Sequence, residues 1–201
     1  MPKTRTVALI LAVIVAACAK KEAPRDTLRV DTGTGAAPAA MPADTAAAAA
    51  ATLTDPNIVF ILHAANAADS ARGKVAETKG TSADVKNFGK MMAGEHHALN
   101  LQGDALAKKL NVTPMAPAND QSEMQARAEM DSLNALATGA AWDKAYIAYE
   151  VGYHQAVMDI ATKALSQAQN AELKALITKA APIIQKHLDR AKEIQTKLGT
   201  A

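Results

Sequence analysis

Five ionisable residues fall on the apolar stripes of predicted helices, where core side chains are expected. His96, His154 and His187 each stand in a run of apolar residues with helical spacing, and Asp69 does so in an earlier run. Glu150 precedes His154 by four residues, so both side chains lie on one side of their helix. Because polar groups on a buried stripe are the informative exceptions, these five residues are candidates for a site inside a helical domain.

Two interpretations of these residues stay open. Neutral imidazole binds zinc, copper, iron or nickel, and three histidines with a carboxylate can form a set of ligands for a transition metal ion. Alternatively, the imidazoles and carboxylates hydrogen-bond to one another and fix the register of the helices. A dinuclear iron site of the ferritin type is not expected, because it uses two Glu-x-x-His motifs and the chain has none.

The elements that position these residues are helices. Apolar residues recur at spacings of three, four and seven, and no run alternates with the period of a strand. The pattern predicts helices over residues 56–79, 82–110, 120–137, 142–168 and 171–198. The first two and the last two are joined by short turns, which favours two antiparallel hairpins, whereas residues 111–141 form a long connection that carries the short helix. We therefore expect an all-α fold, a ferritin-like four-helix bundle with one crossover that carries a short extra helix.

Several helix ends carry recognisable signals. Asp55 precedes Pro56 and is expected to cap the first long helix, and Gly80 is expected to end it. Asn170 is expected to cap the last helix. Pro182 lies inside that helix and is expected to kink it, because proline removes one helical hydrogen bond.

The N-terminal residues 1–17 have the pattern of a bacterial export signal. Lys3 and Arg5 give it a positive start, and an unbroken apolar run of 11 residues follows from Val7 to Ala17. A helix of that length is too short to span a bilayer, which needs about 20 residues. Residues 18–54 are rich in alanine, proline and threonine and predict a disordered tether, and residues 55–201 are expected to form the helical bundle domain.

The sequence before Cys18 predicts lipidation. Val15-Ala16-Ala17-Cys18 resembles the lipobox of bacterial lipoproteins, and the chain has one cysteine. This resemblance implies acylation of Cys18 and a membrane anchor of covalent acyl chains, such as palmitate. By resemblance to bacterial sorting rules, Ala19 favours the outer membrane, with the domain facing the periplasm.

Composition excludes several classes of protein. The chain of 201 residues has 22 Lys+Arg against 20 Asp+Glu, which argues against a nucleic-acid binder. Without Lys3 and Arg5 of the export signal the two counts are equal, so membrane attachment is expected to rest on lipid. One cysteine excludes a disulfide framework and a cysteine-rich metal site. No nucleophile elbow, phosphate-binding loop or dinucleotide fingerprint occurs.

A set of short motifs spread over residues 55–198 points to a family. They include Asn66-Ala67-Ala68-Asp69, Val85-Lys86-Asn87-Phe88-Gly89, Glu95-His96, Tyr153-His154-Gln155 and Ala181-Pro182-Ile183-Ile184-Gln185-Lys186-His187-Leu188. Together they resemble the bacterial domain-of-unknown-function family 4142. The resemblance implies a ferritin-like bundle in exported, often outer-membrane-associated proteins, and no established activity. That family often has Glu at the position of Asp69, and Asp-His at Glu95-His96.

Two functions are consistent with these observations. The first is a lipid-anchored envelope protein without enzymatic activity, a binding or stress-related structural module whose helical surfaces and Trp142 contact an envelope protein partner. The alternative is a periplasmic metal-binding or redox protein that uses Asp69, His96, Glu150, His154 and His187. The spacing predicts that these five side chains face inward, but it does not fix whether they lie at one height along the bundle.

Overall fold

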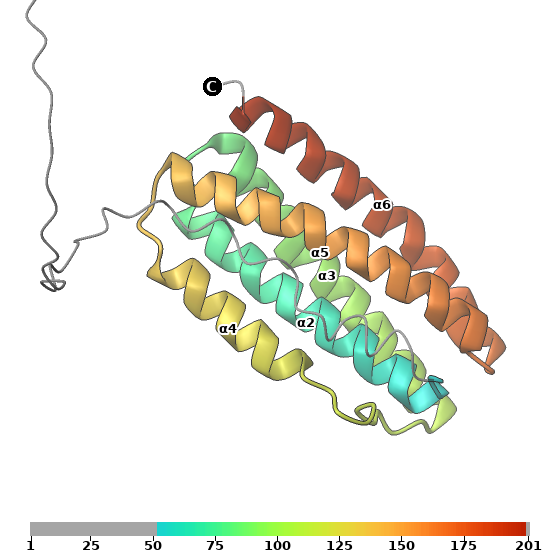
Figure 1. The fold of residues 1–201 in the computed structure, drawn as a ribbon. Helices are drawn as coiled ribbons and strands as arrows, with labels where there is room; N and C mark the ends of the chain where they lie inside the picture. Colours follow the sequence, from blue (N-terminus) through green and yellow to red (C-terminus); the bar gives the residue numbers. More distant parts are fainter. Residues whose placement is uncertain (1–51, 200–201) are drawn as a thin grey trace, which may run out of the picture. The chain divides into compact units, whose positions relative to one another are not determined.

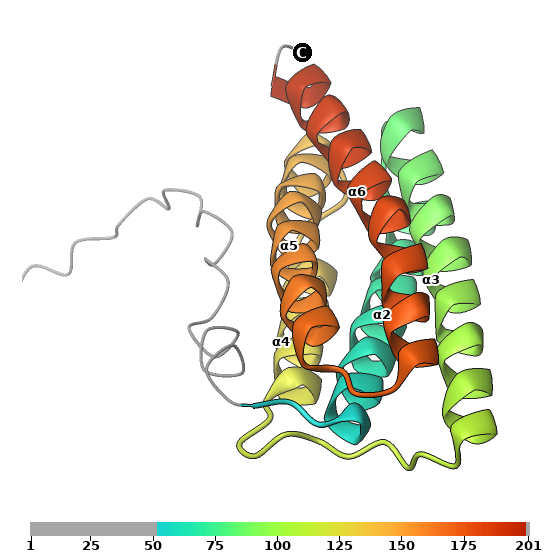
Figure 2. The ribbon, with the colours of Figure 1, turned by 90° about the vertical axis from the view of Figure 1, so that its right-hand side faces the viewer.

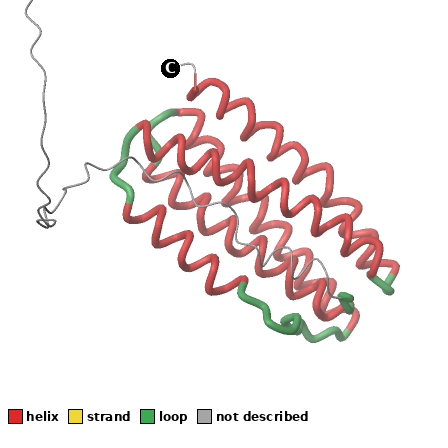
Figure 3. Tube along the Cα trace, in the orientation of Figure 1, coloured by secondary structure: helices red, strands yellow, loops and turns green. Residues whose placement is uncertain are grey.

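The computed structural model describes residues 52–199. The predicted export signal, Cys18 and residues 18–51 of the predicted tether lie outside the described residues. Within residues 52–199 the chain forms α helices and no strand (Figure 3). The helices are α2 (Asp55–Lys79), α3 (Ala83–Leu110), α4 (Ser122–Ala135), α5 (Ala140–Gln167) and α6 (Ala171–Gly199).

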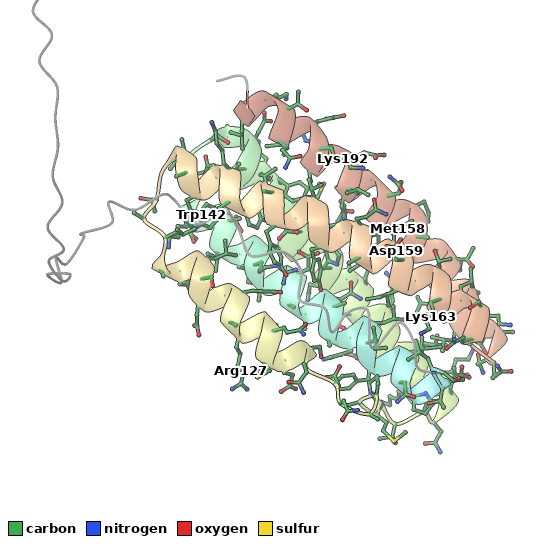
Figure 4. The ribbon with its side chains drawn as sticks, viewed as in Figure 1. Arg127, Trp142, Met158, Asp159, Lys163 and Lys192 are labelled. Carbon is green, nitrogen blue, oxygen red and sulfur yellow. The ribbon has the colours of Figure 1, made fainter. Side chains whose placement is uncertain are left out.

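The four long helices form an all-α bundle made of two hairpins, as the sequence predicted. Helices α2 and α3 form one antiparallel pair, and α5 and α6 form the other (Figure 1). Helix α6 lies beside α3, and this contact holds the two hairpins together (Figure 2). Helix α4 belongs to the crossover and lies along α2 and α5 on the outside of the bundle, with Arg127 pointing away from the other helices (Figure 4). This is the ferritin-like arrangement.

Two carboxylates fix the directions of the hairpins relative to each other. Asp55, at the start of α2, accepts a hydrogen bond from the backbone N–H of Asn170 at the start of α6, at 3.0 Å. Asp143, in the first turn of α5, accepts one from the N–H of Ser82 at the start of α3, at 2.7 Å. Helices α2 and α6 therefore begin at one end of the bundle, and α3 and α5 begin at the other.

Helices α2 and α3 approach each other closely at two glycines. A Cβ atom at Gly73 would lie 2.5 Å from the backbone nitrogen of Ala93, and one at Gly89 would lie 2.7 Å from the carbonyl oxygen of Gly73. Both positions therefore need glycine. Asp69 lies one turn before Gly73, and His96 lies two turns after Gly89, so the crossing brings these two side chains opposite each other.

A layer of five buried ionisable residues divides the core into two apolar clusters. This polar layer consists of Asp69, His96, Glu150, His154 and His187. One cluster contains Ala76, Val85, Phe88, Met92, Leu133, Trp142, Tyr146, Ile147, Ala191 and Ile194. The other contains Leu53, Ile58, Val59, Ala107, Ala164, Ala168, Leu173 and Ile177. On every long helix the candidate ionisable residue falls between the two clusters in sequence. The five candidates therefore share one height near the middle of the bundle.

The observed helix ends differ from the predicted ends by at most two residues. Helix α2 begins at Asp55, and Thr54 is its N-cap in a capping box with Asn57, so the prediction of Asp55 as the cap is wrong. Asn170 accepts from the N–H groups that follow it, as predicted. Helix α6 continues through Pro182.

The described chain starts with residues that contact the bundle. Leu53, in the predicted tether, is buried, and its N–H donates to Gln167 at 2.6 Å. No described helix is both long enough and apolar enough to cross a membrane.

Candidate metal centre

The polar layer unites all five side chains that the sequence singled out. Asp69 comes from α2, His96 from α3, Glu150 and His154 from α5, and His187 from α6. All five are buried, and none is more than 2 % exposed. Every long helix of the bundle thus contributes at least one ionisable group to one small volume.

The facing atoms of this layer are spaced like the ligands of one metal ion. His96 Nε2 lies 3.0 Å and His154 Nε2 lies 3.3 Å from Asp69 Oδ2. His187 Nδ1 lies 3.2 Å from His96 Nε2. Ligands at 2.0–2.2 Å around a tetrahedral zinc ion are about 3.3–3.6 Å apart. The layer therefore needs only a small outward movement to surround an ion.

Asn66 fixes the tautomer of His96. The amide nitrogen of Asn66 donates to the carbonyl oxygen of Leu62 at 2.7 Å, which turns its Oδ1 toward His96. His96 Nδ1–H donates to that oxygen at 2.8 Å. In the neutral ring Nε2 then carries the lone pair, and this is the nitrogen that faces Asp69.

The other two imidazoles are held in the same manner. His154 Nδ1–H donates to the carbonyl oxygen of Glu150 at 2.9 Å. His187 Nε2–H donates to the carboxylate of Glu95, also at 2.9 Å. The lone pairs of the inner nitrogens face the centre of the layer. Histidines that bind metals almost always donate their outer N–H to such an oxygen.

Several buried polar atoms of the layer lack hydrogen bonds within the described part of the chain. They are both carboxylate oxygens of Asp69, Oε2 of Glu150, Nε2 of His154 and Nη2 of Arg72. The contacts of Asp69 with the imidazoles are close, but their angles do not make hydrogen bonds. Buried polar atoms normally have partners, so this arrangement fits a cation between the inner atoms better than a completed hydrogen-bond network.

Arg72 brings a positive charge into the same layer from α2. Its side chain is 1 % exposed, and its Nε lies 3.3 Å from Glu150 and its Nη2 3.5 Å from Asp69. The guanidinium also lies 4.0 Å from the ring centre of Tyr153 and 4.7 Å from that of Tyr149, which are cation–π distances. Arg72 thus occupies the space between the two buried carboxylates.

The pKa values of the layer follow from burial and these charges. Burial alone would raise the pKa of Asp69, but His96 and Arg72 outweigh it and hold that pKa well below its usual range. Burial and the charge of Asp69 raise the pKa of Glu150. Burial lowers the pKa of His154, yet Glu150 and Asp69 outweigh it, so the pKa rises. Burial lowers the pKa of His187 to about 4, against the opposing effect of Glu95.

A family model covers most of the chain. The domain of unknown function DUF4142 matches residues 40–194, which include α2, α3 and α5, most of α6 and every residue of the polar layer. The chain belongs to the DUF4142 family. No match to a curated protein or to a solved structure was found.

Two residues at which this DUF4142 chain differs from the residues often found in the family, Asp69 and Glu95, contribute to the polar layer or contact it. Asp69 provides the carboxylate at the centre of the layer, and Glu95 accepts the outer N–H of His187. His63 and His97, the other two of the five histidines, are exposed. Both remain available as controls for the buried histidines.

Sequence reasoning missed part of this DUF4142 layer. Asn66, Arg72 and Glu95 were not among the candidates, although each contacts one. Asn66 and Arg72 lie three residues before and after Asp69, so the i, i+3 spacing on one helix face was a usable signal. Glu150 faces Arg72 as well as His154, so it belongs to the ion-pair part of the layer.

Proposed function

We propose that this DUF4142 protein binds one divalent transition-metal ion in the middle of its bundle. The ligands are His96 Nε2, His154 Nε2, His187 Nδ1 and a carboxylate oxygen of Asp69. The observation that carries the proposal is the orientation of the three imidazoles. Each outer nitrogen donates to an oxygen, and each inner nitrogen faces the other ligands at 3.0 to 3.3 Å.

The donor set defines the kind of ion. Imidazole nitrogens suit zinc, copper, iron and nickel, and one carboxylate oxygen does not shift this preference toward magnesium or calcium. His96 Nε2 and His187 Nδ1 lie 3.2 Å apart, and two lone pairs at that distance repel unless a proton or a metal ion lies between them. Four buried protein ligands form a closed site. Such a site holds an ion and keeps no coordination position open for the water that hydrolysis needs.

The proposed site takes one ion rather than two. A second cation would have to lie between Asp69 and Glu150, where both carboxylates face inward. The guanidinium of Arg72 already lies there, 3.5 Å from one carboxylate and 3.3 Å from the other. Arg72 therefore supplies the second positive charge itself, and we expect a mononuclear centre.

Metal titration of the full chain, purified without metal-affinity chromatography, tests this proposal. We expect isothermal calorimetry and elemental analysis to give one Zn²⁺ per chain and a higher melting temperature. His96→Gln should lose this binding, whereas His97→Gln, the next residue on α3 with an exposed ring, should keep it. Equal Zn²⁺ binding by the two variants, or a wild-type protein that takes up no metal, would refute the proposal.

The second candidate function is a structural module, and one observation favours it. Arg72 contacts three carboxylates, those of Asp69, Glu129 and Glu150, so the layer also acts as an ion-pair network between three helices. Under this alternative, the histidines only fix the register of the helices. His96→Gln would then lower stability equally with and without Zn²⁺, which separates the two functions.

We propose in addition that the protein works in the bacterial envelope, anchored by acyl chains on Cys18. The support is the export pattern of residues 1–17 and the lipobox that ends at the single cysteine. Radiolabelled palmitate should label the wild-type chain, which should sediment with outer membranes. Cys18→Ala should lose the label, and equal labelling would contradict the proposal.

A further inference from the structure

A cavity lies next to the polar layer, among α2, α3, α5 and α6. Its volume is about 50 Å³, and its wall is almost entirely apolar, with Leu99, Val157 and Ile177 among the lining residues. One part of the wall is formed by His96, together with the Asn66 that orients it. Another part is formed by His63 and Asp104, which are about half exposed and lie 2.9 Å apart. The cavity thus lies between the polar layer and the surface.

The size and lining of the cavity limit what it can hold. Sites for drug-sized ligands and cofactors have volumes of about 300–1,000 Å³, so 50 Å³ suits a molecule of two or three heavy atoms. Apolar cavities of this kind stay free of water and take up apolar guests such as xenon. Of the polar groups in the wall, His63 pairs with Asp104 and His96 with Asn66. Asn100 Oδ1 is then the buried acceptor of the wall that has no partner among the described residues. An apolar diatomic molecule matches this wall better than water does.

We infer that this cavity is a binding chamber for a small apolar gas of the size of dioxygen or nitric oxide, held against His96 of the proposed metal centre. The position of the gas beside a metal centre rests on the proposed function, because His96 is both a wall residue and a proposed ligand. The chamber itself depends only on the cavity. No reaction is assigned to the gas.

Two glycines of α3 provide a matched pair of variants. Gly103 lines the cavity, Gly94 does not, and a Cβ atom at either position meets no atom within 4 Å. Gly103→Leu should fill the cavity, while Gly94→Leu makes the same change on the same helix outside it. Because glycine is a poor residue inside a helix, neither change is expected to lower the melting temperature. Ala161→Leu, on α5, fills the cavity from the other hairpin.

Xenon binding tests the chamber without any metal. We expect xenon NMR of the full chain to show saturable binding in the wild type and in Gly94→Leu, and at least a tenfold weaker effect in Gly103→Leu and Ala161→Leu. Equal binding by all four proteins, or no saturable binding in the wild type, would overturn the chamber.

A second measurement tests the contact with His96. At saturating xenon, we expect the NMR signals of the His96 ring to shift in the wild type and in Gly94→Leu, and at least a tenfold smaller shift in Gly103→Leu. A wild type that binds xenon without shifting the His96 signals would overturn the contact with His96. A wild type that binds xenon but takes up no Zn²⁺ would overturn the proposed function and leave the chamber standing.

Discussion

Arg72 offers the most direct test of how the polar layer is balanced. Arg72→Gln keeps much of the side chain and removes its charge. The wild-type guanidinium is 1 % exposed and lies between Asp69 and Glu150, which are both fully buried. Without it, two buried carboxylates have no permanent positive charge beside them.

The expected cost follows from that burial. Removing one partner of a buried ion pair destabilises a protein by about 3–5 kcal/mol, because the other charge stays buried without compensation. This is a large part of the 5–15 kcal/mol that typically separates folded from unfolded chains. The cost should be smaller at acid pH. The pKa of Glu150 is already raised, and its protonation below that pKa removes one of the two charges.

Added metal should restore more stability to this variant than to the wild type. The freed carboxylates of Asp69 and Glu150 open the position that the guanidinium filled, so bound Zn²⁺ is expected to rise from one to two ions per chain. An ion at 100 times its dissociation constant adds about 2.7 kcal/mol, so two ions would add about 5 kcal/mol. Urea unfolding with and without Zn²⁺, together with elemental analysis, measures both effects.

Arg190→Gln is the matched control. Its side chain is 33 % exposed and pairs with Asp84 and Glu193 at the surface, where such pairs contribute about 0–1 kcal/mol. If Arg72→Gln costs no more than Arg190→Gln, the reasoning about the buried charges is refuted. If its metal content stays at one ion, Arg72 does not occupy a second cation position.

Three further predictions concern the layer and the helix crossing. Asn66→Ala removes the acceptor that orients His96, so the Zn²⁺ dissociation constant should rise by about 10- to 100-fold in a chelator competition assay; an unchanged constant would contradict this role. The pKa of His187 is about 4 in the folded chain against an ordinary 6.5. The unfolded state therefore binds the extra proton first, and the contribution of His187 to the free energy of unfolding should fall by about 3 kcal/mol between pH 6.5 and pH 4. Urea unfolding across this range should show a flatter dependence of the free energy of unfolding on pH for His187→Gln than for the wild type. An equal dependence would argue against a lowered pKa of His187. Gly73→Ala places a Cβ 2.5 Å from the backbone of α3 and should lower the melting temperature, whereas Gly94→Ala should raise it. Equal melting temperatures of the two variants would contradict the close crossing of α2 and α3.

The sequence determined the fold class and most of the helix boundaries. The reason is that helical periodicity and helix caps are local: the cap at Asn170 and the end at Gly80 both follow from neighbouring residues. Asp55 is the exception. Its carboxylate does not cap its own helix but reaches the start of α6, and a partner 115 residues away leaves no local pattern.

The sequence also determined which side chains face inward, and the tertiary structure decided what they do together. Periodicity gives the angle of a residue around its helix but not its height along the bundle. The close crossing at Gly73 and Gly89 sets that height for Asp69 and His96, and the second hairpin brings His154 and His187 to the same level. The burial of Arg72 likewise could not be predicted from the pattern of one helix. A buried guanidinium is favourable only where carboxylates from different helices, here Asp69 and Glu150, lie beside it.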